Sequence, residues 1–353
     1  MKSIGIGIMS LAHGHVNAYC AQIAGFEDAH LAACWDDNRG RGAAAAQRYD
    51  MPLCDAPEDL VERADVDAVI IGIETYRHAE MVRLAARAGK HILLQKPMAL
   101  TLEDCDQIIS DVENAGVQFS MAYQMRQDPM NQKIREMVQN GELGKVGVIR
   151  RRHCIPALFH ESFHSSWHVD PVKNMGMWMD DASHAADFLL WVMGKPVSVV
   201  AEIDNLLSSA APDDTGCAIY RFESGAMGVL FNSSVVWAGE NTTEVYGDEA
   251  VLIQNHDDGP STNTAASLPH PIGLKVWRSA EAERGWQDLG FPIPASHGAR
   301  IAAVARPFID YLKDSSKPHA TAQEGKLCIE MILGAYRSAQ EGRRVSLPLS
   351  EQS

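Results

Sequence analysis

The chain has 353 residues, of which 46% are hydrophobic and 22% charged, a composition typical of a globular protein long enough for two domains. Its formal net charge of −15 argues against binding to nucleic acid or to an anionic membrane surface, since both would repel it. The sequence shows seven scattered cysteines without a C-x-x-C pair, no signal peptide and no apolar stretch of spanning length. These features predict a cytoplasmic protein without disulfides or a membrane segment.

Short apolar runs alternate with helical patterns over the first part of the chain. The runs expected as strands are 4–9, 31–35, 66–73, 91–94 and 117–122, and the helical patterns are 16–24, 43–49, 78–88 and 102–115. Nearly continuous apolar strands that alternate with helices are typical of a parallel sheet covered on both faces. We therefore predict a doubly wound α/β domain over residues 1–122.

After residue 123 the pattern changes. Helices are expected at 129–140, 176–194, 298–314 and 323–342, and alternating runs at 146–153, 197–203, 215–222, 226–234, 243–246 and 250–254. Alternation of apolar and polar residues is typical of antiparallel strands with one solvated face. The prediction is a second α/β domain over residues 123–353, built on an open, mainly antiparallel sheet, whose last helices are free to pack back on the first domain.

The helix expected over residues 176–194 carries three ionisable side chains. Asp180, His184 and Asp187 stand at i, i+4 and i+7, so they would share one helical face. The later part of this helix is apolar nearly all round, which indicates a buried helix. Because ionised groups are costly to bury, they either satisfy one another in a structural network or serve a site. The residues of this stretch alone leave both interpretations open.

The first strand is followed by Ser10-Leu11-Ala12-His13-Gly14, where a dinucleotide-binding fold has its phosphate turn. Asp36 ends the second strand 24 residues beyond Ala12, a spacing expected of the acidic residue that accepts ribose hydroxyls. That position favours NAD, and the nearby arginines at 39 and 41 keep NADP open. A flavodoxin-like sheet without a dinucleotide is a competing interpretation of the same residues.

Two further motifs complete an ordered set. Gly89-Lys-His-Ile-Leu-Leu-Gln-Lys-Pro-Met-Ala99 places a lysine and a proline directly after a strand, and Asp180-x-x-x-His184-x-x-Asp187 comes from the second domain. Shorter segments accompany them, at 141–145, 167–170, 214–225 and 335–345. With these motifs the chain resembles the glucose–fructose oxidoreductase/inositol dehydrogenase (Gfo/Idh/MocA) family over nearly its whole length.

The resemblance implies an N-terminal Rossmann domain and a C-terminal α/β domain whose open sheet forms a homodimer or homotetramer. It implies NAD(P)-dependent oxidation or reduction of a sugar, cyclitol or related polyol at the domain interface. The catalytic set of the family falls on Lys96, Asp180 and His184. In this set the histidine would accept the hydroxyl proton, the aspartate would orient the histidine, and the lysine would stabilise developing negative charge.

Further site residues follow from their positions and from the resemblance. The expected cofactor contacts are Ser10, Leu11, Ala12, His13, Asp36, Ile73, Glu74, His78, Gln95 and Lys96. The expected substrate contacts are Tyr123, Arg126, His164, Trp167 and Trp178. The sequence departs from the family pattern at Gln95, where Glu is usual, and at Ile73-Glu74-Thr75, where Thr-Pro-Asn is usual. These departures leave the choice between NAD and NADP, and turnover itself, open.

The histidines before the 176–194 helix raise the question of a metal. His160, His164 and His168 stand at i, i+4 and i+8 and could bind zinc from one helical face. Because the chemistry of the family needs no metal and the surrounding residues do not dictate a helix, we expect none. Two functions besides a dehydrogenase are compatible with the sequence. One is an NAD-dependent glycoside-processing enzyme that uses transient oxidation, and the second is a non-catalytic nucleotide-binding regulator.

Overall fold

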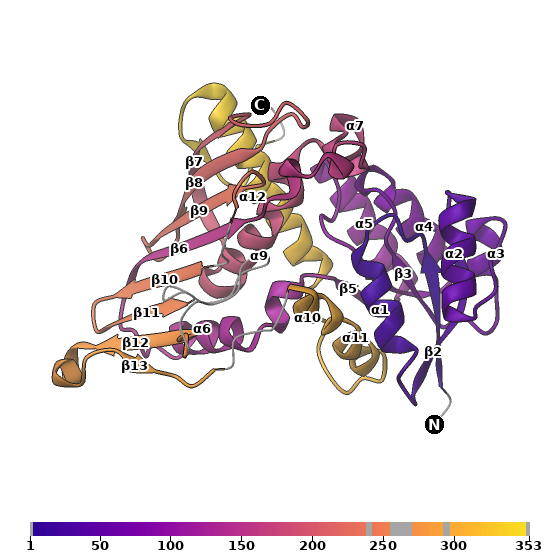
Figure 1. The fold of residues 1–353 in the computed structure, drawn as a ribbon, viewed down its shortest axis with the longest axis horizontal. Helices are drawn as coiled ribbons and strands as arrows, with labels where there is room; N and C mark the ends of the chain where they lie inside the picture. The colour runs from indigo at the N-terminus through magenta and orange to yellow at the C-terminus, as the bar shows by residue number, and fades with distance from the viewer. Residues whose placement is uncertain (1–2, 238–241, 255–269, 292–296, 351–353) are drawn as a thin grey trace. The chain divides into compact units, whose positions relative to one another are not determined.

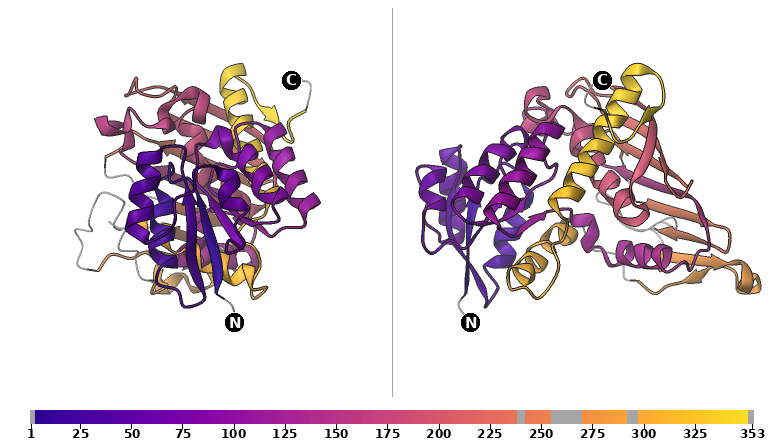
Figure 2. Two further views of the ribbon diagram at one scale, coloured as in Figure 1. Left: turned by 90° about the vertical axis from the view of Figure 1, so that its right-hand side faces the viewer. Right: turned by 180° about the vertical axis from the view of Figure 1, so that it is seen from behind.

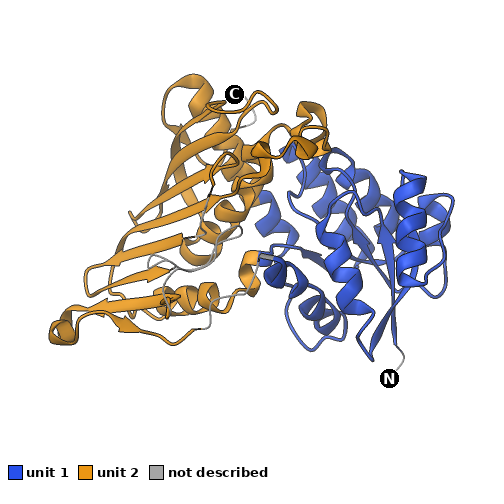
Figure 3. Ribbon diagram, in the orientation of Figure 1, with its two compact units in different colours: residues 1–124, 298–326 blue, residues 125–297, 327–353 orange. Residues whose placement is uncertain are grey.

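The computed structural model describes residues 3–237, 242–254, 270–291 and 297–350 and divides the chain into two compact units (Figure 3). Unit 1 comprises residues 1–124 and 298–326, and unit 2 comprises residues 125–297 and 327–353. The limits expected from the sequence, 1–122 and 123–353, differ from this division by two residues and by the assignment of 298–326 to unit 1. Within the described ranges, no helix combines the length and apolarity that crossing a bilayer requires.

Unit 1 is built on a five-stranded parallel sheet of order β2-β1-β3-β4-β5. Its strands are β1 (Ile4–Met9), β2 (Ala29–Trp35), β3 (Ala68–Ile71), β4 (His91–Leu94) and β5 (Phe119–Met121). Every residue of β3 is buried, as are most residues of the other four strands. This sheet confirms the parallel arrangement predicted from the continuous apolar runs.

Helices lie on both sides of the parallel sheet, as the left view of Figure 2 shows. They are α1 (His15–Ile23), α2 (Arg39–Tyr49), α3 (Pro57–Val61), α4 (His78–Arg87), α5 (Leu102–Ala115), α10 (His297–Ala302) and α11 (Ala305–Leu312). The last two come from the end of the chain, yet Val304 and Phe308 belong to the same buried cluster as Val16 and Tyr19 of α1. The core of unit 1 is therefore assembled from both ends of the sequence.

Unit 2 contains a nine-stranded sheet of order β13-β12-β11-β10-β6-β9-β8-β7-β14. Its strands are β6 (Val146–Cys154), β7 (Pro196–Asp204), β8 (Thr215–Phe222), β9 (Met227–Ser233), β10 (Thr242–Gly247), β11 (Ala250–Gln254), β12 (Leu274–Arg278), β13 (Gln287–Asp288) and β14 (Val345–Ser346). The central pair β6 and β9 is parallel, and the other pairs are antiparallel. The mainly antiparallel sheet is confirmed, and the parallel pair is a feature that the sequence did not predict.

The helices of unit 2 lie on one face of this sheet (Figure 1). They are α6 (Pro129–Gln139), α7 (Pro171–Asn174), α8 (Met177–Asp180), α9 (Ala182–Met193) and the second part of α12 (Ala322–Glu341). Helix α9 packs on β6 and β9, and the Tyr220 hydroxyl of β8 donates a hydrogen bond to the carbonyl of Met331 in α12. The opposite face exposes alternate side chains such as Ile219 and Tyr246. The sheet therefore has one helix-covered face and one open face in the described part of unit 2.

Candidate active site

The turn after β1 is closed by the carboxylate of Asp36 at the end of β2. The backbone N–H groups of Leu11 and Asn38 donate to its two oxygens, each at 2.8 Å, and Ser10 Oγ lies 3.3 Å away. Ser10 itself has φ 69°, in the left-handed region that residues other than glycine rarely adopt, so the chain turns sharply here. The turn lies directly before α1, where the sequence placed the phosphate-binding segment.

In this turn the backbone N–H groups of the next two predicted residues donate hydrogen bonds. The N–H of Ala12 donates to Ser10 Oγ at 3.1 Å, and the N–H of His13 donates to the carbonyl of Gly72 at 2.8 Å. Gly72 follows β3, and an added Cβ there would lie 2.3 Å from a Val16 side-chain carbon. The end of β3 and the turn therefore approach each other as closely as a glycine allows.

Arg41 of α2 binds the carboxylate of Asp36, which was predicted to accept ribose hydroxyls. Its guanidinium contacts both oxygens of Asp36 at 2.8 Å and also contacts Asp37 Oδ1 at 2.8 Å. A carboxylate offers about four acceptor positions, and the backbone donors and Arg41 together fill those of Asp36. A ribose that binds Asp36 must therefore displace Arg41. Burial and the nearby Glu74 carboxylate raise the pKa of Asp37.

A cavity of about 350 Å³ adjoins Asp36 and Asp37. It is lined by Trp35, Asp36, Asp37, Arg39, Leu53, Cys54, Asp55, Ala56 and Pro57. Four of these nine residues are charged, so the cavity suits a polar small molecule. The chain thus offers a tight turn before a helix, an acidic strand end and an adjoining pocket, which together fit the adenosine half of a dinucleotide.

His78 joins the loop after β3 to the segment that carries Lys96. Its Nδ1 lies 2.9 Å from the carbonyl oxygen of Pro97 and 3.2 Å from that of Met98, and its Nε2 lies 3.1 Å from that of Ile73. The ring is fully buried, and burial lowers the pKa of His78 to about 4. The structure therefore places this predicted cofactor residue as a support for the Lys96 loop.

Gln95 differs from the glutamate usual at its position, and its contacts suit an amide. Its Nε2 donates to Tyr19 Oη at 2.7 Å, and its Oε1 accepts from the backbone N–H of Lys96 at 3.1 Å. The side chain is fully buried. A carboxylate there could not donate to Tyr19 and would carry a charge at a site with neutral partners, so the substitution is locally consistent.

The single helix expected over residues 176–194 is two helices, α8 and α9, with Asp181 between them. The carboxylates of this stretch bind different partners. Asp180 Oδ2 lies 2.7 Å from His168 Nδ1, Asp181 Oδ2 accepts from Ser234 Oγ at 2.7 Å, and Asp187 Oδ1 pairs with the Arg126 guanidinium at 2.6 Å. The expectation of one continuous helix is wrong, because the helix is interrupted at Asp181. Arg126, predicted to contact substrate, is buried in an ion pair.

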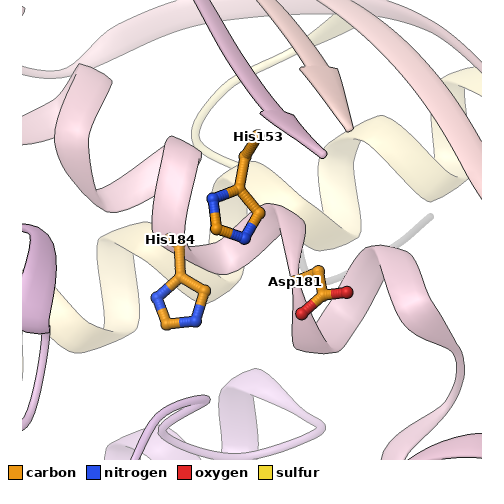
Figure 4. A group of neighbouring side chains, drawn as sticks. All are labelled: His153, Asp181 and His184. Atoms are coloured by element: carbon orange, nitrogen blue, oxygen red, sulfur yellow. The ribbon is translucent and has the colours of Figure 1, made fainter. Parts of the chain in front are cut away.

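Asp181 and His184 lie close to a third residue, His153, whose place here the sequence does not indicate. One ligand atom each from His153, Asp181 and His184 lies within 4.8 Å of the other two, and Figure 4 shows the rings and the carboxylate together. The two imidazole centroids are 5.0 Å apart, and all three residues are buried. His153 is the next-to-last residue of β6, and only the pairing of β6 with β9 could have indicated its place here.

The histidine-rich stretch before α7 forms three separate 3₁₀ turns, at Ala157–Phe159, Glu161–Phe163 and Trp167–Val169. His160, His164 and His168 therefore do not share one helical face, and within the described residues no metal-ligating group of three includes them. His164 Nε2 instead lies 2.9 Å from the carbonyl oxygen of Leu158. His168 stacks on Trp167 at 3.8 Å and on Phe163 at 5.4 Å, measured between ring centroids. Trp167 thus borders the His168–Asp180 pair.

The start of α8 is fixed by Asp213 and Tyr336. The Asp213 carboxylate accepts from the backbone N–H of Trp178 at 2.6 Å and from the Tyr336 hydroxyl at 2.7 Å, and that hydroxyl accepts from the N–H of Met179 at 3.1 Å. Burial raises the pKa of both Asp213 and Tyr336. The Trp178 ring packs where a Cβ on Gly216 would lie 2.5 Å from it. Trp178, predicted to contact substrate, is thus a core side chain of unit 2.

Comparisons with known proteins agree with this two-part chain. A profile described as an oxidoreductase family with an NAD-binding Rossmann fold matches residues 3–123, and a GFO/IDH/MocA C-terminal domain profile matches residues 131–253. A myo-inositol 2-dehydrogenase of Thermotoga maritima is 28% identical over 82% of this chain and 83% of its own length. An inositol 2-dehydrogenase of Rhizobium meliloti is 29% identical over 92% of this chain and 94% of its own length.

The fold also matches solved structures over nearly the whole chain. Levoglucosan dehydrogenase in complex with NADH superposes with a TM-score of 0.84 at 20% identity and covers 99% of this chain and 100% of its own. At that identity the likeness concerns the fold. It confirms the predicted combination of a parallel nucleotide-binding sheet with a mainly antiparallel second sheet.

Proposed function

Because the chain belongs to the GFO/IDH/MocA oxidoreductase family, we propose that it is an NAD-dependent dehydrogenase of sugars, cyclitols or related polyols. Profiles of that family match both parts of the chain, and the first is an NAD-binding Rossmann fold. The substrate class is supported by two relatives that are named as inositol 2-dehydrogenases. The observation that carries the proposal is the buried His184 imidazole beside the Asp181 carboxylate at the start of α9.

Oxidation of a secondary alcohol removes a hydride from the carbon and a proton from the hydroxyl, and NAD⁺, when bound, supplies the hydride acceptor. We assign the proton transfer to His184, because an imidazole accepts and returns a proton near neutral pH. The Asp180 carboxylate, which the sequence predicts to orient His184, lies against His168. The Asp181 carboxylate lies within 4.8 Å of a ring nitrogen of His184 and is a second candidate for that role.

Lys96 is proposed to stabilise the negative charge that develops on the reacting oxygen. An ammonium group in a buried position is effective there because little water screens its charge. Lys96 is 2% exposed and directly follows Gln95, which accepts its backbone N–H. His78 holds the two residues that follow Lys96, so the backbone on both sides of the lysine is fixed.

The decisive experiment compares His184→Ala with the unchanged protein. Turnover is expected to fall about 10²–10⁴-fold, the usual contribution of a general base, while the Kd for NAD stays within a few-fold. The assay follows absorbance of the reduced nicotinamide against a panel of sugars and cyclitols, with NAD binding measured by calorimetry. His160→Ala, at an exposed histidine, is the control. Retained turnover in His184→Ala would remove His184 from the reaction.

A matched pair of substitutions separates the two aspartates. Asp180→Asn and Asp181→Asn remove the same charge at neighbouring positions, and the variant that loses more turnover at constant NAD affinity identifies the carboxylate that orients His184. NAD binding without turnover on any polyol would contradict the dehydrogenase. Cleavage of a glycoside without net NADH would instead identify a glycoside-processing enzyme.

We also propose that the open face of the unit 2 sheet pairs with a second copy of the chain. Ile219 lies opposite Val229 in the register of β8 and β9, and both side chains point to the face without helices. Ile219 is 39% exposed and Tyr246 is 42% exposed. An apolar stripe of this kind is costly to leave in water. Light scattering should show a dimer or tetramer that Ile219→Glu shifts toward the monomer, and a monomeric unchanged protein would contradict this.

A further inference from the structure

The parallel strand pair of unit 2 brings together side chains that are far apart in the sequence. β6 and β9 run parallel, so their carboxyl ends meet at the same edge of the sheet. His153 lies at the end of β6, and Ser234 directly follows β9. Helix α9 packs on both strands with its first turn at this edge, and Asp181 and His184, three residues apart, face it. Three elements therefore converge on one small volume.

We propose that His153, Asp181 and His184, here called the His-Asp-His cluster, bind one Zn²⁺ ion. Two imidazole nitrogens and a carboxylate oxygen are a common ligand set for zinc, and three protein ligands leave a fourth position open. Metal–ligand bonds of about 2.0–2.2 Å require ligand atoms about 3.3 Å apart. Those of the cluster are at most 4.8 Å apart, so they must move closer by up to about 1.5 Å when the metal binds.

Ser234 holds the Asp181 carboxylate of the cluster in place. Its hydroxyl donates to Asp181 Oδ2 at 2.7 Å, while its own backbone N–H is bound to the carbonyl of Asp214 at 2.8 Å. Such a contact fixes the orientation of a ligating carboxylate. The ligands themselves are 2%, 6% and 3% exposed for His153, Asp181 and His184, so little water competes for them.

The consequence for catalysis rests on the proposed function. A metal ion on His184 occupies a ring nitrogen that would otherwise accept a proton. Zn²⁺ is therefore expected to inhibit turnover over the same concentration range in which it binds. Metal binding itself is measured without substrate or NAD, so the two proposals are tested separately. Zinc binding with unchanged turnover would overturn the base role of His184 and leave the metal site intact.

The test is a titration of the purified, metal-free chain with Co²⁺, whose visible absorption is intense in tetrahedral sites, followed by displacement with Zn²⁺. One equivalent is expected for the unchanged protein. His153→Gln and Asp181→Asn each remove one ligand and should weaken binding by at least about tenfold. Ser234→Ala removes only the supporting hydroxyl and should weaken it by about 10–100-fold, the usual effect of such partners.

His160→Gln is the matched control, because it removes an exposed histidine from the neighbouring histidine-rich stretch. It should bind Co²⁺ as the unchanged protein does. Thermal unfolding and NAD affinity of every variant show whether it is folded. Equal Co²⁺ uptake by the unchanged protein and His153→Gln, both folded, would overturn the proposal. Loss of binding in His160→Gln alone would also overturn it and would move the metal to the histidine-rich stretch.

Discussion

Replacing His78 by Gln should make the protein less sensitive to acid. In the folded chain the His78 ring is fully buried and its pKa is about 4, against an ordinary value of 6.5. Burial is the main cause of the lowered pKa, because it disfavours the charged form. In the unfolded chain the ring binds a proton below pH 6.5. In the folded chain it binds one only below about pH 4. The contribution of the neutral His78 ring to the free energy of unfolding is therefore fully present above pH 6.5. It is lost as the pH falls from there toward 4.

The size of the effect follows from the two pKa values. With 6.5 in the unfolded chain and about 4 in the folded chain, the free energy of unfolding falls by about 2 kcal/mol between pH 7.5 and pH 5, and by about 3 kcal/mol below pH 4. Gln at position 78 does not titrate, so this part of the pH dependence should vanish. The amide keeps a donor for one of the carbonyl oxygens near the ring, those of Ile73, Pro97 and Met98.

The measurement is urea unfolding at pH 7.5 and pH 5.0, followed by circular dichroism. The difference between the two unfolding free energies should be about 2 kcal/mol smaller for His78→Gln than for the unchanged protein. His30→Gln, at an exposed histidine of the same unit, should behave as the unchanged protein. An equal pH dependence in His78→Gln would refute the reasoning. It would mean that the ring keeps its proton when folded, with both nitrogens donating to carbonyl oxygens.

Three further substitutions test other parts of the structure. Asp36→Asn should raise the Kd for NAD, measured by calorimetry, at least about tenfold. The reason is that a hydrogen bond from the ribose to a charged carboxylate contributes about 1.5–3 kcal/mol. An unchanged Kd would place the ribose elsewhere. Asp187→Asn removes the charge that pairs with the buried Arg126 guanidinium and should lower the free energy of unfolding in urea by about 3–5 kcal/mol. A decrease below about 1 kcal/mol would mean that water reaches the pair. Tyr336→Phe removes the hydroxyl that bridges Asp213 and α8 and should cost about 1–3 kcal/mol; no measurable loss of stability would argue against that bridge.

Elements with a strong local signal were predicted closely. β1 and β4 have the expected bounds, because each is a short apolar run with polar or glycine neighbours. Helix α5 also begins and ends where expected, since Thr101 caps its first turn and Gly116 ends it in the left-handed conformation. In these cases neighbouring residues alone decide the structure.

Features that depend on distant partners were not predicted. Nothing within residues 176–194 indicates that Asp213 binds the start of α8 or that the helix divides at Asp181. The parallel pairing of β6 and β9 joins segments about 80 residues apart, and their alternation is the same as that of antiparallel strands. The place of His153 beside His184 follows from that pairing. Periodicity reports which face of an element is buried, and it does not report which element covers it.

The composition of the unit 1 core has a consequence for biosynthesis. Val304, Phe308 and Ile309 pack into the same cluster as Val16 and Tyr19, although the first stretch of unit 1 ends at residue 124. The ribosome adds about 5–20 residues per second, so α11 follows the first stretch by about 10–40 s. During that interval the nascent nucleotide-binding domain presents an uncovered apolar surface around α1. We therefore expect messages truncated before α11 to yield aggregated protein, even though they encode the complete parallel sheet.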